Sequence, residues 1–311
     1  MCLVSFVLPA YKAPYLSQAI ASIIEQSYTN WELIIVDDAS PEDLRSIVNS
    51  FDDPRIRYYR NTENIGGKNL VQQWNLSIGY ASGDYIVLAA DDDTYHPDFL
   101  ETCVKLAQSY PQVDLIRAQV GIINEENNLV GIDGLIPEYC SKHAFLYYWL
   151  RATILTCIGN YMFKSIAIKE KKFVYFPSAF CSDAATSILL SANGMVNTKE
   201  MLFNFRISTI HLSSSKTQLD NKLKANTLFY QWLLDLNYEV PKDAIEHFFY
   251  RGNNRSYIYG KCLYDYYNQV IKYLPWSKFY AIRYCKLLSK KDKVVMLFRF
   301  CFDSLFKNNG L

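Results

Sequence analysis

Short apolar runs alternate with helical patterns over the first 120 residues of the chain. Runs of strand length occupy 3–8, 32–36, 56–59, 85–90 and 113–118. Between them, apolar residues recur at helical spacing over 15–26, 42–51, 70–81 and 97–110. Because strands that alternate with helices pair in parallel through right-handed crossovers, the pattern predicts an α/β fold built on a mostly parallel sheet.

Beyond about residue 120 the alternation of apolar runs and helical patterns becomes less regular. Residues typical of loops follow, namely Gly131, Asp133, Gly134 and Pro137. Helices are expected over 144–155 and 183–192, and the chain beyond Ser215 reads as largely helical and rich in aromatic residues. We therefore predict one domain over 1–215, followed by a helical, basic and aromatic C-terminal region over 216–311.

The strand predicted over 85–90 ends in three consecutive carboxylates, Asp91, Asp92 and Asp93. Buried strands exclude uncompensated charge, and neighbouring carboxylates repel one another. A positive partner is therefore expected, and one or two carboxylates typically hold Mg²⁺ or Mn²⁺ together with the oxygens of a polyphosphate. The alternative is an acidic turn in solvent that caps the helix beginning near Pro97.

Polar residues also follow the first two predicted strands. Pro9 and Tyr11 end the first strand, and Asp38 and Ser40 follow the second. In parallel sheets ligands bind beyond the carboxyl ends of the strands, so these residues should meet the three carboxylates at one edge. Asp38 can bond a base or a ribose while Ser40 caps a helix, and Tyr11 can stack on a nucleobase. In a chain with 25 Tyr an ordinary loop aromatic is also consistent, and Lys12 is as readily a solvated side chain.

Three further features each have two readings. The paired glycines in Asn64–Lys68 allow a positive φ and a close backbone approach to a ligand, although the segment is not a Walker A loop. Asp183 lies at the start of a predicted helix. It is either a general base or a helix N-cap, and from the sequence alone we favour the N-cap by about two to one. Arg206 and His211 flank a Ser-rich run. These two residues could bind a phosphate or a metal ion. Alternatively, they are ordinary residues of the core or the surface.

The charge of the chain is unevenly distributed. Its net charge is +1, but residues 261–311 hold ten Lys and Arg against three Asp, a local +7. A basic region rich in aromatic residues suits contact with an anionic membrane surface. Packing of those aromatics onto the catalytic domain is equally consistent with the composition. We expect no nucleic-acid partner.

The cysteines indicate a reduced, cytosolic setting. All eight are scattered, without a Cys-x-x-Cys pair or the spacing of a zinc site. No run of 18 apolar residues occurs, so a spanning helix is not expected. The apolar start of the chain lacks a basic segment and a cleavage site, and it reads as a first strand rather than a signal peptide.

The strand ends belong to a longer ordered pattern. Its blocks are VSFVLPAY at 4–11, SIIEQSY at 22–28, WELIIVDDAS at 31–40, NIGG at 64–67, WN at 74–75, ASGDYI at 81–86 and DDD at 91–93. This pattern resembles family 2 of the glycosyltransferases, the inverting enzymes with the GT-A fold. The likeness covers roughly residues 3–110, with a thinner match to about 215. It implies a Rossmann-like sheet that binds a nucleotide-diphospho-sugar.

The resemblance assigns six residues to the sugar nucleotide, namely Pro9, Tyr11, Asp38, Lys68, Asn75 and Asp91. Among them Tyr11 stacks on the base, Asp38 contacts the base, and Asp91 contacts the ribose. The other residues of the set line the donor site.

The resemblance also implies a metal ion and a catalytic base. Asp92 holds Mg²⁺ or Mn²⁺, and we place His211 at the same ion. The common form of the family motif has Asp two places before Asp92, where this chain has Ala90. Metal binding should therefore depend heavily on the donor diphosphate. Asp183 is the catalytic base, and an ordinary carboxylate pKa suffices for that role.

These roles predict a cytosolic inverting glycosyltransferase that is peripheral at the inner face of the cell membrane. It would move a sugar from a nucleotide-diphospho-sugar, most readily a UDP-sugar, to a hydroxyl of a glycan or lipid-linked acceptor in surface polysaccharide biosynthesis. One alternative is a nucleotidyltransferase, although the Gly-rich basic signature of that class is absent after the first strand. The other is a catalytically inactive protein that binds nucleotide-sugars, which Ala90 keeps open.

Overall fold

The computed structural model describes residues 2–208 and 218–307. The chain divides into two compact units, which we call unit 1 and unit 2 and describe separately. Unit 1 comprises Met1–Tyr175 and Ser182–Thr209, and unit 2 comprises Phe176–Cys181 and Ile210–Leu311. The domain division that we placed after residue 215 stays a prediction.

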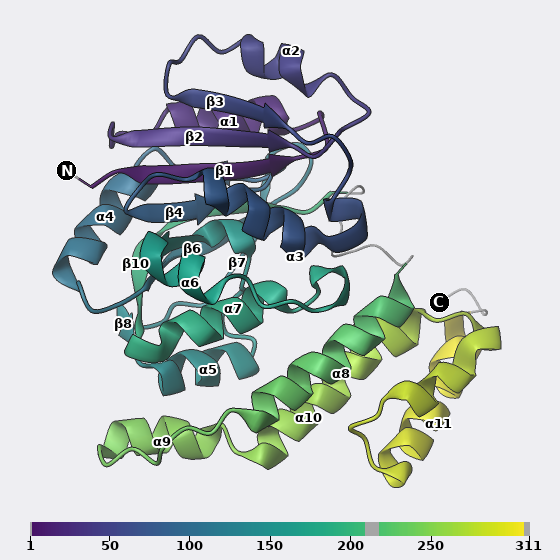
Figure 1. Cartoon of the computed structure of the whole chain (residues 1–311). Coiled ribbons are helices and arrows are strands. Elements are labelled where there is room, and N and C mark those ends of the chain that lie inside the picture. The colour runs from purple at the N-terminus through teal and green to yellow at the C-terminus, as the bar shows by residue number, and fades with distance from the viewer. Residues whose placement is uncertain (1, 209–217, 308–311) are drawn as a thin grey trace. The chain divides into compact units, whose positions relative to one another are not determined.

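Unit 1 is built on one mixed sheet with helices packed against it (Figure 1). In spatial order its strands are β3 (Ile56–Arg60), β2 (Trp31–Asp37), β1 (Val4–Ala10), β4 (Tyr85–Leu88), β9 (Tyr161–Lys164), β6 (Leu115–Ile123), β10 (Met195–Arg206) and β5 (Thr94–Tyr95). In addition, β7 (Leu129–Ile132) pairs with β6, and β8 (Tyr139–Cys140) pairs with β10. All five strands predicted from the sequence are present, and the α/β class is confirmed.

The sheet is parallel on one side and mixed on the other. Strands β3, β2, β1 and β4 run parallel, whereas β9 runs antiparallel to both of its neighbours, β4 and β6. Beyond residue 120 the two helices expected over 144–155 and 183–192 are present, but Gly131 lies in β7 rather than in a loop, and we had not predicted β8, β9 and β10. The pattern of β10 is broken by three exposed residues, 199–201, and by register shifts in the same place, so it lacks a clean period of two.

The central strands are buried on both faces. Phe6 and Leu33 pack in the core with residues of α1 (Leu16–Ile24) and α4 (Phe99–Ser109). Val7 and Ile34, which point to the opposite face, are also fully buried. Strands covered on both sides read as continuous apolar runs, which explains why the sequence located them well. The remaining helices of unit 1 are α2 (Leu44–Asn49), α3 (Gly66–Ser77), α5 (Lys142–Leu150), α6 (Ser165–Lys171) and α7 (Ser182–Leu190).

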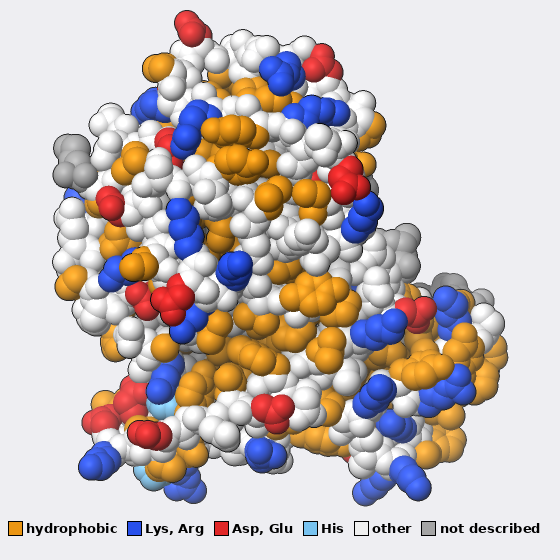
Figure 2. All heavy atoms as spheres, in the orientation of Figure 1, with side chains coloured by type: hydrophobic (Ala, Val, Ile, Leu, Met, Phe, Trp, Pro, Cys, Tyr) orange, Lys and Arg blue, Asp and Glu red, His pale blue; other side chains and the backbone are white. Residues whose placement is uncertain are grey.

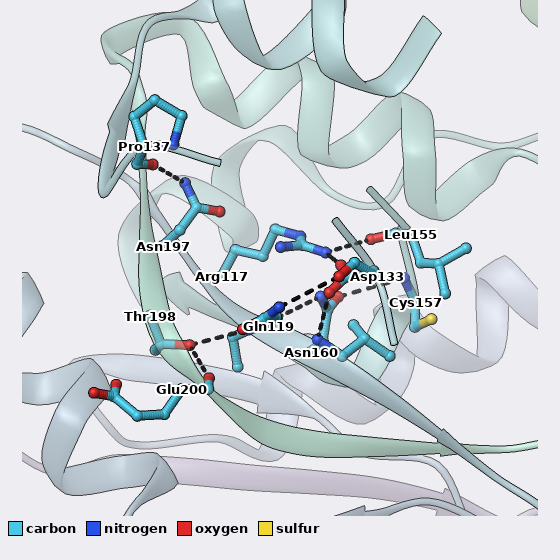
Figure 3. A network of polar contacts seen from close by, with 12 residues as sticks. Arg117, Gln119, Asp133, Pro137, Leu155, Cys157, Asn160, Asn197, Thr198 and Glu200 are labelled. Carbon is cyan, nitrogen blue, oxygen red and sulfur yellow. Dashed lines mark hydrogen bonds and ion pairs between the residues drawn. The ribbon is translucent and has the colours of Figure 1, made fainter. Parts of the chain in front are cut away.

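A buried polar network ties β6 to the segments beside it (Figure 3). Arg117 and Asp133 form an ion pair, and each side chain is only 1% exposed. The Arg117 guanidinium also donates to the Leu155 carbonyl at 3.0 Å, and the Asp133 carboxylate accepts from the Val120 N–H at 3.0 Å. Asp133 thus lies in a loop directly after β7, as the sequence indicated, and its side chain is buried there.

Unit 2 is helical, as expected. Its helices are α8 (Leu219–Asp235), α9 (Ala244–Gly252), α10 (Arg255–Asp265) and α11 (Lys290–Lys307), with a π-helical turn at Tyr266–Val270 and a 3₁₀ segment, η7, at Trp276–Tyr284. The core of unit 2 contains buried Phe229, Tyr230 and Tyr266. The Tyr230 hydroxyl donates to Asp265, which also pairs with Lys261 at 2.6 Å. Within 2–208 and 218–307, none of the helices combines the length and apolar character needed to cross a membrane.

Candidate active site

The carboxyl ends of β2, β1 and β4 are connected by side-chain hydrogen bonds. The Asp91 carboxylate, just past β4, accepts from the backbone N–H groups of Tyr11 and Lys12, both at 2.9 Å. The Ser40 hydroxyl, just past β2, donates to the Tyr11 carbonyl at 2.7 Å. The polar clusters that follow three strands in the sequence therefore meet at one edge of the sheet, where ligands bind in such folds.

Ser40 and Asp93 have partners that the sequence did not indicate. We expected Ser40 to cap the following helix, but Asp43 is the N-cap of α2 and accepts from the Ser46 N–H. We also considered Asp93 as a cap, yet α4 begins at Phe99, and Asp93 instead accepts from the backbone N–H of Arg206 at 2.9 Å. Both side chains thus connect strand ends rather than begin helices.

Burial shifts the titration of all three consecutive carboxylates. It raises the pKa of Asp91 to about 6, and the adjacent Asp92 charge adds to the rise. Burial also raises the pKa of Asp92, and it raises the pKa of Asp93 well above its ordinary value. The charge of Lys12 lowers the pKa of Asp91 and Asp92, so this lysine faces the carboxylates rather than being merely solvated. A site of this kind favours binding of positive charge.

Arg206 supplies a buried positive charge from within the chain. Its guanidinium is fully buried at the end of β10 and donates through Nε to the Asp92 carbonyl at 2.7 Å. It also donates to Asn127 at 2.7 Å and to Gln18 at 3.0 Å, and it lies over the Tyr15 ring at 4.3 Å. These contacts hold Arg206 in a structural role, and its charge lowers the pKa of Asp92 and Asp93.

Asp92 is the carboxylate that best suits a metal ion. It is 9% exposed, and no N–H or O–H of another described residue donates to its side chain. In the described part of the chain there is no group of three or more His, Cys, Asp or Glu that could hold a metal. One carboxylate completed by diphosphate oxygens is nevertheless an arrangement that Mg²⁺ and Mn²⁺ accept, so the residues fit such an ion. His211, our second expected ligand, lies outside the described residues.

Asp38 is held by the segment that leads into α3. One carboxylate oxygen accepts from the Asn61 amide at 2.7 Å and the Ile65 N–H at 2.9 Å, and the other accepts from the Gly66 N–H at 2.7 Å. The second oxygen retains a lone pair for a ligand. Gly66 does not have the positive φ that we considered for the paired glycines. It is needed because a Cβ there would stand 2.8 Å from Asp38 Oδ2.

The other residues predicted to bind the sugar nucleotide differ in their exposure and in the contacts that they already make. Tyr11 is exposed, and Pro9 is partly buried within β1 opposite Val36. The Lys68 ammonium pairs with Glu63 at 2.5 Å in an exposed ion pair. The Asn75 amide both accepts from and donates to the Phe173 backbone, at 2.9 and 3.4 Å, which gives it a structural function. Contact of these four residues with a donor stays a prediction.

Asp183 lies in the first turn of α7 and accepts from the Ala184 N–H at 2.8 Å. Burial raises its pKa to about 6, above the ordinary value that the proposed role would already allow. Burial also raises the pKa of the Cys157 thiol, and the charges of Asp93 and Asp183 add to that rise. The same buried thiol therefore lies close enough to both carboxylates to sense their charges.

Asn61 and Lys12 are the site residues that sequence reasoning missed or undervalued. Asn61 holds both Asp38 and Gln73, at 2.7 and 2.8 Å. Its only sequence signal is its place directly after β3 (Ile56–Arg60), at the same edge of the sheet. Lys12 likewise follows a strand end, two residues beyond β1. Position relative to a strand end was a better guide to these residues than residue type.

Two solved structures have the same overall fold as this chain. S. aureus TarS 1–349, solved in complex with UDP-GlcNAc, has a TM-score of 0.67 at 13% sequence identity, covering 99% of this chain and 92% of that chain. The mannosyltransferase PcManGT of Pyrobaculum calidifontis, solved with GDP-Man and Mn²⁺, has a TM-score of 0.55 at 16% identity, covering 99% and 87%. At such identities the likeness shows the fold, which is of the GT-A type.

The sequence comparisons then give the family. The profile described as Glycosyl transferase family 2 matches residues 5–166, which is just over half of the chain. The chain belongs to glycosyl transferase family 2. This membership argues against the nucleotidyltransferase that we considered.

Curated relatives match over the N-terminal part only. Over 130 residues, the chain is 32% identical to UDP-Glc:alpha-D-GlcNAc-diphosphoundecaprenol beta-1,3-glucosyltransferase WfgD of Escherichia coli, covering 42% of this chain and 49% of the relative. It is 40% identical over 101 residues to WcaA of E. coli strain K12, named for colanic acid biosynthesis, covering 32% and 35%. The chain thus spans between a third and a half of the length of these relatives.

Proposed function

We propose that the chain is an inverting glycosyltransferase that transfers a sugar from a UDP-sugar to a hydroxyl of a glycan or lipid-linked acceptor in surface polysaccharide biosynthesis. The observation that carries this proposal is Asp183, a partly buried carboxylate with its pKa raised to about 6, in the same unit as the Asp91–Asp93 strand end. WfgD and the TarS complex support a UDP-sugar, and WfgD supports a lipid-linked acceptor. We place the reaction at the cytoplasmic side of the membrane, since activated sugars are made there.

The chemistry requires a base on the acceptor side. One Oδ atom of Asp183 takes the proton of the acceptor hydroxyl while that oxygen bonds to the anomeric carbon. The bond between the anomeric carbon and the diphosphate breaks on the opposite face, UDP leaves with the electron pair, and the configuration inverts. A general base works best when its pKa lies near the working pH, and a carboxyl with a pKa of about 6 is ionised at pH 7 while remaining a stronger base than ordinary Asp.

The donor would lie against the edge formed by β2, β1 and β4. Tyr11 is exposed to stack on the base, Asp38 offers one free lone pair to it, and Asp91 lies beside the Tyr11 backbone to meet the ribose. Lys12 adds a positive charge for the diphosphate. A divalent cation held by Asp92 would act as a Lewis acid that neutralises charge on the leaving diphosphate.

Gly66→Ala tests the base-contacting role of Asp38. The added Cβ would stand 2.8 Å from Asp38 Oδ2, so the carboxylate must move and lose its bond to this N–H. We expect UDP to bind roughly fivefold more weakly, measured by titration calorimetry, because a hydrogen bond contributes about 1 kcal/mol. Gly79→Ala is the matched control, because no atom lies within 4 Å of its Cβ. If UDP binds both variants equally well, Asp38 does not contact the donor.

Metal binding should require the nucleotide. At 100 times its Kd, UDP with Mn²⁺ should stabilise the protein by about 2.7 kcal/mol, or roughly 5 °C in melting temperature. Mn²⁺ alone should have little effect, because the described residues contain no group of three or more His, Cys, Asp or Glu that could hold a metal. Asp92→Asn should abolish the part of the shift that depends on the metal. A full shift with Mn²⁺ alone, or an unchanged shift in the variant, would contradict the assignment.

Product analysis separates the proposed activity from its rivals. A purified enzyme given Mn²⁺ and a panel of UDP-sugars should release UDP, both by slow hydrolysis and by transfer to an acceptor. A nucleotidyltransferase would instead make a sugar nucleotide from a nucleoside triphosphate and a sugar phosphate. A binding-only protein would show the thermal shift with its sugar nucleotide but release no UDP.

A further inference from the structure

The outer surface of unit 2 carries an exposed apolar face. It is formed by Val294, Phe298, Phe302 and Leu305 of α11. We call this set the C-terminal face. Phe298 is 72% exposed and Phe302 is 61% exposed, although a soluble protein normally buries such side chains. In Figure 2 hydrophobic side chains are interspersed with Lys and Arg over the region of α11, at the lower right.

Helix α11 has two apolar sides. Met296 and Phe300, four residues apart, are buried, and the Phe300 ring stacks on Trp276 with 5.8 Å between centroids. Positions 294, 298, 302 and 305 recur at spacings of four, four and three, so they share the other side of the helix. The packing of unit 2 therefore buries one side of α11, whereas the side chains of the second side are exposed. The aromatic tail therefore contributes in part to the core of unit 2, and contact of its exposed residues with a membrane stays a prediction.

The charges around the C-terminal face are mostly positive. Lys290, Lys291 and Arg299, all from the same helix, are exposed. The two acidic residues of α11 have partners within unit 2, because Asp292 accepts from Tyr259 and from Ser289, and Asp303 accepts from Tyr267. Because both acidic side chains have partners, the exposed surface of α11 consists mainly of apolar side chains with Lys and Arg beside them.

We propose that the C-terminal face lies on an anionic lipid bilayer, with α11 parallel to its plane. Aromatic and aliphatic side chains would enter the boundary between headgroups and acyl chains, while flanking Lys and Arg meet lipid phosphates, which is how amphipathic helices bind membranes. This proposal extends the proposed function. It depends on that function in one respect, because an enzyme with a lipid-linked acceptor would meet that acceptor at the membrane.

Charge argues against a second copy of the chain as the occupant. In a symmetric dimer the C-terminal face would meet itself, since such interfaces join the same patch on both partners. Residues 261–311 carry a net +7, so two such faces would repel each other. An anionic bilayer instead complements both the apolar strip and its cationic border.

Vesicle flotation tests the proposal on the full chain. We expect the protein to float with vesicles of phosphatidylcholine and phosphatidylglycerol, and to stay largely unbound with phosphatidylcholine alone. Phe298→Ser/Phe302→Ser should lower binding at least 100-fold, because each exposed aromatic side chain is lost from the membrane boundary. Lys290→Gln/Lys291→Gln should weaken binding about fivefold per lysine and only to anionic vesicles.

The matched control is Ile245→Ser/Phe248→Ser in α9. These two side chains are 67% and 60% exposed, close to the values for the α11 pair, but they lie outside the C-terminal face. The control should bind vesicles as the parent does. Equal losses in both double variants, or no vesicle binding by the parent, would overturn the proposal, as would a parent dimer that the α11 variant dissociates. UDP release in solution should be unchanged in every variant, which separates this proposal from the proposed function.

Discussion

Asp183→Asn should lower the rate of sugar transfer by about 10²- to 10⁴-fold, the range that a general base typically contributes. The affinity for UDP should stay within twofold, because Asp183 faces the acceptor in our mechanism rather than the nucleotide. Asn keeps an oxygen that can accept from the Ala184 N–H, so the start of α7 is preserved. Steady-state kinetics with saturating donor and UDP calorimetry measure the two quantities.

Asp243→Asn is the matched control for the capping alternative. Asp243 is the N-cap of α9 and accepts from the N–H groups of Ile245 and Glu246. Asn caps a helix about as well as Asp, so this control should keep full activity. If Asp183 is also only a helix cap, then Asp183→Asn will match the control, and our assignment of the base is wrong.

The pH profile provides a second check on Asp183. Because its pKa is raised to about 6 in the folded protein, the rate should rise with pH up to about 6 and then level off. A rate that stays flat down to about pH 4 would indicate an ordinary carboxylate. Between pH 4 and 6 the folded state binds the extra proton, so this group lowers stability as pH rises through that window. The Asn variant should therefore be at least as stable as the parent at pH 7.

Arg117→Met should lower the free energy of unfolding by about 3–5 kcal/mol, because it leaves the Asp133 charge buried and unpaired. Both side chains are 1% exposed, and the Asp133 carboxylate also holds the Val120 N–H at 3.0 Å. Urea unfolding followed by tryptophan fluorescence measures the loss. Arg117→Met/Asp133→Asn should recover most of the stability, since the double variant removes both charges and keeps an acceptor for Val120.

A surface ion pair is the control for this effect. Lys105 and Glu101 are 2.7 Å apart on α4, and both are exposed. Exposed pairs contribute little, so Lys105→Met should hardly change the urea midpoint. If Arg117→Met is no more destabilising than Lys105→Met, water reaches Asp133 after the substitution, and the pair does not hold β6 in place.

Much of the candidate site could be predicted from the sequence because strand ends have a clear signature. A buried parallel strand reads as an apolar run, and the polar residue after it is confined to the ligand edge of the sheet. Asp38, Asp91 and Asp92 were found in this way, and the structure places all three at that edge. Residues held by distant partners had no such signal. Arg206 is 114 residues from the Asp92 carbonyl that it binds.

The sequence alone determined the α/β architecture, the five strands of the first 120 residues and the acidic edge, because each depends on local periodicity. Only the tertiary structure showed which charges neutralise one another. It paired Arg117 with Asp133, brought Arg206 beside Asp92 and Asp93, and raised the pKa of Asp183 by burial. It also divided the aromatic residues of the tail between a buried and an exposed side of α11. Burial and charge pairing depend on contacts between residues far apart in the chain, and a local pattern does not contain them.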